Sequence, residues 1–243
     1  MAQIYRLLFS LFVLTRLMTG ADAHVLLENI RRKVVEQLSR SANYTCIETI
    51  DRTYYRDMRR PSAACEGVDE VWRQEMMHDR LRLNVAVSKG GEIFSWRGEN
   101  NLSTSKVDKI VQGGPISSGG FVGFLRNVFT VPGVKFTYRG ESKEDHAVSE
   151  RFDYAVGEAI SLYRVEGAGN QSAIVPFHGS FSANASTLEL NRLEIIADKI
   201  PMGLRICSAD FGVHYQIAAI LGNNTLIPAS FDLRIQDQTH FIR

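Results

Sequence analysis

The chain has 243 residues, of which 28 are lysine or arginine and 27 are aspartate or glutamate, so its formal net charge is +1. The basic residues are spread along the sequence, which excludes the concentrated basic patch of a nucleic-acid-binding protein. Hydrophobic residues make up 44% of the chain, enough for a full core in one large β domain or two small ones.

The first 23 residues have the features of a secretory signal peptide. Arg6 precedes an apolar run from Leu7 to Leu14, and the segment Ala21–Ala23 has the small-residue pattern of a cleavage site. The apolar run is far shorter than the roughly 20 residues that cross a bilayer. We therefore expect cleavage after Ala23, a periplasmic or secreted protein and no transmembrane segment in the mature chain. Cleavage removes two of the 28 basic and one of the 27 acidic residues, which leaves 26 of each and a neutral protein.

Three cysteines occur in a chain expected in an oxidising compartment. Cys46 and Cys65 flank a polar loop that contains Pro61, and a disulfide between them would add about 3 kcal/mol of stability. The alternative is that all three cysteines are small buried thiols. Cys207 lies in an alternating run and is expected to be a core thiol, because a nucleophilic role requires a nearby base.

The sequence after the signal peptide predicts one amphipathic helix and then a long strand. Leu27, Ile30, Val34 and Leu38 recur at helical spacing on one side. Residues 43–58 are rich in β-branched and aromatic side chains and contain no glycine or proline, which is typical of a strand.

Strand patterns dominate the remaining sequence. Residues 80–88 alternate between apolar and polar side chains and turn through two glycines into 92–96, which predicts a hairpin. Residues 134–142 and 146–156 predict a second hairpin in the same way. Further strands are expected at 160–165, 174–183, 188–197, 204–218 and 226–236, with a tight turn at 222–224.

About ten strands with few helical interruptions predict a mainly β (α+β) fold. Sheets of this size usually curl or close in a way that protects their edges. We therefore expect a strongly curved antiparallel sheet or an unclosed β-barrel of about ten strands, with an N-terminal helix. No repeat, low-complexity tract or linker divides residues 24–243, so a single domain is expected.

One segment in the middle of the chain is predicted to form a buried helix. In residues 121–129 only Arg126 and Asn127 are strongly polar. A Gly/Ser-rich loop, residues 112–120, leads into it. The helix is either a lid on a flexible hinge or an ordinary core helix behind a flexible loop.

The order of these elements resembles that of a known fold. A helix precedes "NYTCIETIDR", and "RLRLNVAVSKGGEIFSW" follows it. This order is similar to that of the periplasmic lipoprotein-carrier (LolA-like) fold and the related sensor domain of the envelope-stress regulator RseB. "NYTCIETI", "EIFSW" and "IVPFHGSF" also look like segments of a group of uncharacterised secreted bacterial proteins. The carrier resemblance implies an unclosed β-barrel whose concave side is covered by helices and, in the carriers, receives acyl chains.

The stretch "PFHGSFS" places a histidine close to two serines. The strand period of two sets Phe177, Gly179 and Phe181 on one face and His178 and Ser180 on the other. Same-face neighbours lie about 6.5 to 7 Å apart, whereas a nucleophile and its base approach to about 3 Å. No G-x-S-x-G elbow surrounds the serine. A half-buried strand is expected, in which the glycine allows a close contact or a bulge.

Metal and cofactor sites are not expected. The six histidines are scattered, with no H-E-x-x-H and no C-x-x-C, and the loop "QGGPISSGG" lacks the order of a phosphate-binding loop. Five N-x-[ST] sequons matter only in a host that glycosylates secreted proteins, and they begin at Asn43, Asn101, Asn170, Asn184 and Asn223.

Three functional hypotheses follow. The first is a secreted, non-enzymatic binding protein of the cell envelope that carries or senses a lipid or another apolar ligand in the concave face of its sheet. The second is a protein-interaction or envelope-sensor module whose long strands pair with a strand of an envelope partner. The third is a hydrolase built around the histidine or a serine of "PFHGSFS". For the first hypothesis, the candidate cavity-lining residues are Phe121, Phe124, Leu125, Val128, Phe177 and Phe181.

Overall fold

The computed structural model describes residues 20–57, 65, 73–88, 91–99, 107–111, 120–144, 147–167, 171–237 and 240–242. The described chain is mainly β, with antiparallel strands and an N-terminal helix. Its helices are all too short or too polar to cross a membrane. Most of the predicted signal peptide lies outside the described residues, and the predicted cleavage point after Ala23 falls within the first helix.

The described helices are α1 (Gly20–Arg40), α2 (Val107–Ile110) and α3 (Gly120–Phe129). The strands in the first part of the chain are β1 (Tyr44–Asp57), β2 (Arg73–Ser88), β3 (Gly91–Trp96), β4 (Lys135–Glu144) and β5 (Ala147–Val156). They are followed by β6 (Arg164–Glu166), β7 (Ser172–Ile174), β8 (Phe177–Asn184) and β9 (Leu190–Ala197). The last three are β10 (Ile206–Ile220), β11 (Asn223–Asp237) and β12 (His240–Ile242).

Both predicted hairpins form, as β2–β3 and β4–β5, and the turn at Gly222 joins β10 to β11. The predicted strand at 160–165 is largely wrong. Residues Glu158–Ile160 form a 3₁₀ turn, and strand β6 begins only at Arg164. The side chain of Ser161 competes with strand pairing here, because its hydroxyl accepts a hydrogen bond from the N–H of Tyr163 at 3.1 Å and donates one to the carbonyl of Val175.

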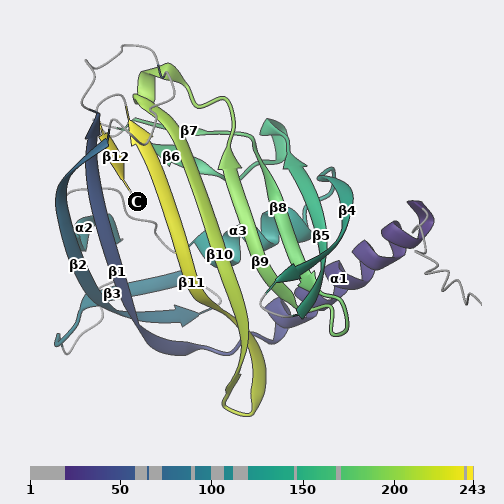
Figure 1. The fold of residues 1–243 in the computed structure, drawn as a ribbon. Coiled ribbons are helices and arrows are strands. Elements are labelled where there is room, and N and C mark those ends of the chain that lie inside the picture. The colour runs from purple at the N-terminus through teal and green to yellow at the C-terminus, as the bar shows by residue number, and fades with distance from the viewer. Residues whose placement is uncertain are drawn as a thin grey trace, which may run out of the picture.

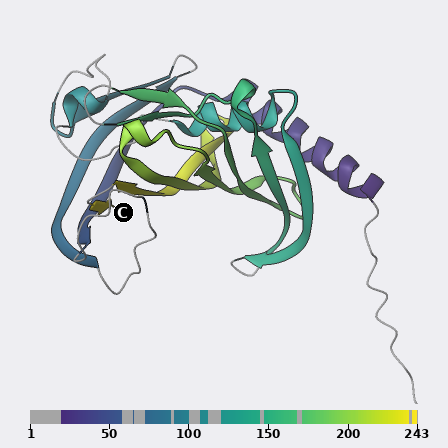
Figure 2. The same cartoon turned by 90° about the horizontal axis from the view of Figure 1, so that it is seen from above.

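Ten described strands form one sheet in the order β3-β2-β1-β12-β11-β10-β9-β8-β5-β4 (Figure 1). β6 and β7 form a separate pair. The last strand of the chain, β12, therefore lies inside the sheet, between β1 and β11. The sheet has two edges, at β3 and β4, so the described strands do not close into a barrel. The helices lie on one side, and the β1–β2 and β4–β5 arms bend toward the other side (Figure 2).

Helix α3 forms where it is predicted and packs as a core helix. Phe129 at its end is 1% exposed, and the Nε of Arg31 in α1 donates to its carbonyl at 3.1 Å. Asn127 is also buried, and both ends of its amide have partners. Its Nδ2 donates to the carbonyl of Ile160 at 2.8 Å, and its Oδ1 accepts from the N–H of Leu162 at 2.7 Å. These bonds remove the cost of a polar group inside an apolar helix.

Two main hydrophobic cores stabilise different parts of the sheet. The larger core joins α1 and α3 to β5 and β8–β11, and it contains stacked rings of Phe152 and Phe181 with centroids 5.2 Å apart. The smaller core joins β2 and β3 to α2. Its buried residues are Leu81, Leu83, Val85, Val87, Phe94, Val107 and Val111. The β1–β3 unit is therefore packed largely independently of the remaining strands.

The disulfide joins Cys65 to Cys207, so the predicted pairing of Cys46 with Cys65 is wrong. The two bonded residues have Cα atoms 5.1 Å apart, within the usual range for a disulfide. Cys46 is a free, exposed thiol on β1. The prediction weighed closeness in sequence, whereas the distance between Cα atoms in the folded chain decides which cysteines pair. The bond connects the segment between β1 and β2 to the start of β10.

Removing this disulfide is expected to destabilise the protein strongly. Cys65→Ser should lower the free energy of unfolding by about 3 to 5 kcal/mol, because the bond closes a loop across a sequence separation of 142 residues. Cys46→Ser is the matched control, with an expected change below about 0.5 kcal/mol. Urea unfolding measures both values. Equal losses from the two substitutions would contradict the observed pairing.

Candidate functional site

An open seam divides the sheet between β1 and β11. β12 spans it at one end, where it pairs with Tyr54–Arg56 of β1 and with Ile235 and Gln236 of β11. Beyond β12, no described strand pairs with the facing edges of residues 44–53 of β1 or 223–234 of β11. Because β12 is antiparallel to both, β1 and β11 run parallel to each other along the seam.

A cleft of about 770 Å³ follows this seam. Its walls include residues 46–53 of β1 and residues 227–233 of β11. A cleft above the face of a sheet is lined by every second residue of a strand, because side chains alternate between faces. Consecutive lining residues on both strands therefore show that the cleft runs between two strand edges, within the plane of the sheet.

The two sides of the cleft differ in polarity. On the side of the helices, its wall is apolar, and the rings of Phe121 and Phe231 lie 5.3 Å apart between their centroids. The opposite side carries hydroxyl and carboxylate groups. The apolar lining residues include Val85, Val87, Phe121, Phe231 and Leu233, and the polar ones include Thr49, Asp51, Ser230 and Asp232.

Two glutamates enter the cleft on its apolar side. Glu48 comes from β1 and Glu92 from β3, and both are half-buried. Burial raises the pKa of Glu48 to about 7. Burial together with the charge of Glu48 raises the pKa of Glu92 to about 7. Neither carboxylate has an ion-pair partner among the residues that the structure describes. The two groups therefore hold an uncompensated negative charge that changes near neutral pH.

The free thiol of Cys46 lies in the same cleft without the setting of a nucleophile. Although the residue is exposed, partial loss of water around the thiol and the nearby Glu48 and Glu92 raise its pKa. Reactive cysteines need the opposite, a positive environment that favours the thiolate. Burial also raises the pKa of Tyr44 to about 12, and the nearby Cys46 and Glu92 contribute to this rise.

A partly buried ion pair lies at the β12 end of the seam. The side chain of Arg52 is 7% exposed, and its Nε donates to Oδ1 of Asp79 on β2 at 2.8 Å. The guanidinium also lies 5.6 Å from the ring centroid of Tyr54. The hydrogen bond from the arginine lowers the pKa of Asp79. This pair fixes β1 to β2 at the point where β12 begins to fill the seam.

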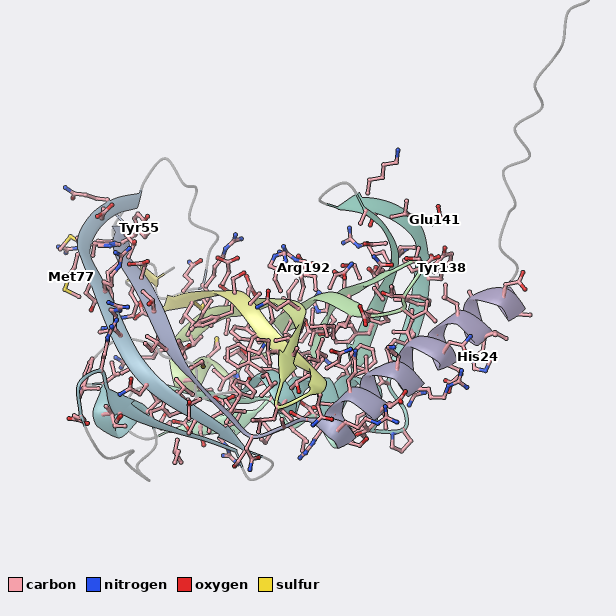
Figure 3. The ribbon with its side chains drawn as sticks, turned by 90° about the horizontal axis from the view of Figure 1, so that it is seen from below. His24, Tyr55, Met77, Tyr138, Glu141 and Arg192 are labelled. Atoms are coloured by element: carbon pink, nitrogen blue, oxygen red, sulfur yellow. A yellow bond between two sulfur atoms is a disulfide. The ribbon has the colours of Figure 1, made fainter. Side chains whose placement is uncertain are left out.

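A second, polar groove of about 650 Å³ lies on the face away from the helices. Figure 3 shows Arg192 of β9 between the two arms, with Tyr55 and Met77 on one and Tyr138 and Glu141 on the other. Its guanidinium contacts the carboxylate of the nearby Glu194 at 2.9 Å and also contacts a histidine ring on β10. Hydrogen bonds and an ion pair therefore join the polar side chains that line this groove.

In "PFHGSFS", all residues after Pro176 lie in β8, and its histidine and serine do not form a nucleophile and base. Nδ1 of His178 is 2.9 Å from both carboxylate oxygens of Asp198. The hydroxyl of Ser180 instead donates to Glu194 at 2.7 Å, in the polar groove. The two side chains therefore bind different partners. The stretch forms the expected strand, without the contact between a nucleophile and its base that a hydrolase needs.

The six candidate cavity-lining residues are brought together, but mostly in the packed core. Leu125, Val128 and Phe177 are at most 2% exposed. The ring of Phe124 packs against that of Phe177 with centroids 5.8 Å apart. Phe121 does line the cleft along the seam, and Phe181 lines part of the polar groove.

Comparison with protein-family models, curated proteins and solved structures gives no significant match. Within the described ranges, no three histidine, cysteine or acidic side chains lie close enough together to hold a metal ion.

Sequence reasoning missed Glu48 and Glu92, although the sequence carried a signal for one of them. Glu48 falls on the alternation that contains Tyr44, Cys46 and Ile50, so it is a charged residue on the apolar face of a strand. Such a position is costly without a function or a partner.

Replacing both glutamates by glutamine should change the pH dependence of stability. The folded state keeps protons that the unfolded carboxyls release above about pH 4.5, so wild-type stability should fall as the pH rises toward about 7. The double variant Glu48→Gln/Glu92→Gln should lack most of this fall and gain about 1 kcal/mol at pH 8, since one pKa unit is worth about 1.4 kcal/mol and half-burial weakens the effect. Urea unfolding at pH 5 and pH 8 measures this. The exposed Glu75→Gln is the control, and a double variant with the wild-type pH dependence would contradict the assignment.

Gly179 is the position in β8 that tolerates no side chain. A Cβ there would lie 1.8 Å from the carbonyl oxygen of Glu194, which also accepts a hydrogen bond from Tyr154 at 2.6 Å. Gly179→Ala should therefore lower the free energy of unfolding by at least about 3 kcal/mol. Gly123→Ala in α3 is the matched control. No atom lies within 4 Å of its added Cβ, and alanine should be neutral or stabilising by about 0.5 to 1 kcal/mol. Similar unfolding midpoints for the two variants would refute the close contact.

Proposed function

We propose that this chain is a secreted, non-enzymatic binding protein of the cell envelope, and that its ligand lies in the cleft between β1 and β11. The observation that supports the proposal is the cleft itself. Its volume of about 770 Å³ falls in the range of about 300 to 1,000 Å³ typical of ligand sites. Its apolar wall, with Phe121, Phe231 and two valines, provides contacts that favour an apolar group.

The chemistry of the side chains supports binding over catalysis. His178 is engaged by Asp198, and Ser180 is engaged by Glu194, so neither activates the other. Cys46 has a raised pKa, which lowers its thiolate fraction at neutral pH. The order of helix and strands that resembles the lipoprotein carriers supports the same proposal, since those proteins hold acyl chains.

The two glutamates narrow the class of ligand. The cationic end of an apolar ligand would form an ion pair with Glu48 or Glu92, and a neutral end could donate a hydrogen bond to either. An anionic end would be repelled by their uncompensated negative charge. A cationic end should also bind more tightly above pH 7, where both carboxyls are ionised.

A displacement assay tests this proposal. Nile red bound in the cleft should be displaced by dodecylamine at least tenfold more effectively than by dodecanoate at pH 8, both below their micelle concentrations. Ala229→Trp on the exposed rim of the cleft should lower the affinity for Nile red at least tenfold, because the indole fills the space.

Thr137→Trp on the exposed face of β4 is the matched control, and it should leave the affinity unchanged. Nile red that does not bind, or that binds equally to the two tryptophan variants, would contradict the proposed site.

A second candidate function is the protein-interaction module. The observation that favours it is the two strand edges along the seam with which none of the described strands pairs, since such edges can bind the backbone of a partner as well as form the walls of a pocket.

A further inference from the structure

The walls of the seam carry backbone groups as well as side chains. In a strand with a partner on one side, about half of the N–H and C=O groups point to the other side. β1 is paired to β2 along its whole length, so residues 44–53 direct their remaining groups into the seam. β11 does the same from its side, because its ladder to β10 leaves the opposite edge of residues 223–234 without a described strand. Two parallel rows of donors and acceptors therefore face each other.

β12 shows what fits between these rows. Ile242 pairs with Tyr54 of β1 and also with Ile235 of β11. At this end, β1 and β11 are thus separated by the width of one strand, about 4.8 Å to each side. The next position along the line of β12 would lie opposite Thr53 and Arg234. The seam continues the slot that β12 begins to fill.

A covalent bond links the two sides of the slot near its β12 end. The Cys65–Cys207 bond connects the segment after β1 to β10 on the far side of the seam. At the other end, the chain passes from α1 into β1 next to a small cavity lined by Tyr44, Leu226 and Pro228. Pro228 has no N–H, and proline in a sheet is confined to edges and bulges. Its place at the β10–β11 bulge is consistent with an open edge on β11.

We infer that the slot accepts an extended segment of about ten residues from a partner polypeptide, which runs in line with β12 and antiparallel to both β1 and β11. This inference rests on the proposed function, because it names the ligand of the same cleft. Ten residues at about 3.3 Å each span the length of β1 from Thr53 to Tyr44. The segment is bound by main-chain hydrogen bonds on both sides, which is the recognition mode called β-augmentation.

The cleft also sets the side-chain pattern of this segment. Directly opposite residues of neighbouring strands place their side chains on the same face. If the first residue of the segment pairs with Thr53, its sixth residue lies opposite Glu48 and its eighth opposite Cys46, because each step moves one residue back along β1. The even positions therefore face the apolar wall, with a lysine or arginine favoured at the sixth. The odd positions face Thr49, Asp51 and the polar side.

Backbone pairing is tested with a synthetic peptide. The probe is a decapeptide with threonine at odd positions, valine at even positions and lysine at the sixth. The full chain should bind it, and N-methylation of three central amides should weaken binding at least tenfold while all side chains stay the same. Replacing the lysine by glutamate should also weaken binding, and Glu48→Gln should reduce the difference between the two peptides. Equal affinity of the methylated and unmethylated peptides would overturn the inference.

Register and direction are tested through Cys46. A peptide with cysteine at its eighth position is supplied as the mixed disulfide with thionitrobenzoate. The Cys46 thiolate attacks the peptide sulfur, a Cys46–peptide disulfide forms, and thionitrobenzoate leaves with the electron pair of the broken bond. Its release should be at least tenfold faster than with cysteine at the third position, and Cys46→Ser should abolish it. Equal rates for both positions would overturn the stated register.

Two further results separate this inference from the proposed function. Nile red that binds to a protein with no affinity for the peptide would refute the strand and leave the apolar site intact. Failure of both ligands would refute both. A chain lengthened after Arg243 by residues two to ten of the same peptide should fill its own slot in the same register and lose peptide binding, because position 244 falls opposite Arg52. Unchanged binding by that chain would overturn the inference.

Discussion

The constraint on which this structure depends is that every backbone N–H and C=O group needs a partner. On the side of β2, β1 meets it along its whole length, whereas on its other side the described strands pair with it only at Tyr54–Arg56, where β12 lies. The remaining groups border the cleft, and so do those of β11. The position of the cleft within the sheet, its lining by consecutive residues and its one-strand width at β12 are all consequences of this incomplete ladder. The candidate site is thus a missing part of the sheet.

Two features explain why the seam does not simply close. The β1–β3 unit buries its apolar side chains with α2, and the other strands bury theirs with α1 and α3, so closure adds little apolar burial. Closure would also enclose Glu48 and Glu92, whose pKa values of about 7 already reflect the cost of removing water from a carboxylate. β12 and the Cys65–Cys207 bond connect the two parts while the charged centre of the seam stays accessible to solvent.

Local patterns in the sequence predicted the local structure well. The helix with Leu27, Ile30 and Val34, the apolar helix α3 and both hairpins depend on spacing between residues close in sequence, and the structure has all of them. The disulfide was missed because Cys207 is distant in sequence from Cys65. The seam was missed for a related reason. It depends on which distant strands pair, and alternation within one strand says nothing about its neighbours. The carboxylate of Glu48 on an apolar strand face was the one available signal.

Amide hydrogen exchange of the unbound protein, followed by NMR, tests the open seam most directly. In residues 44–53, every second amide of β1 should exchange rapidly, because it points into the seam, and the alternate amides bonded to β2 should be protected. Addition of an extended peptide should then protect the rapidly exchanging set, together with the facing amides of β11. Uniform slow exchange of all amides from Tyr44 to Thr53 in the unbound protein would show that the ladder is complete, and it would contradict the account.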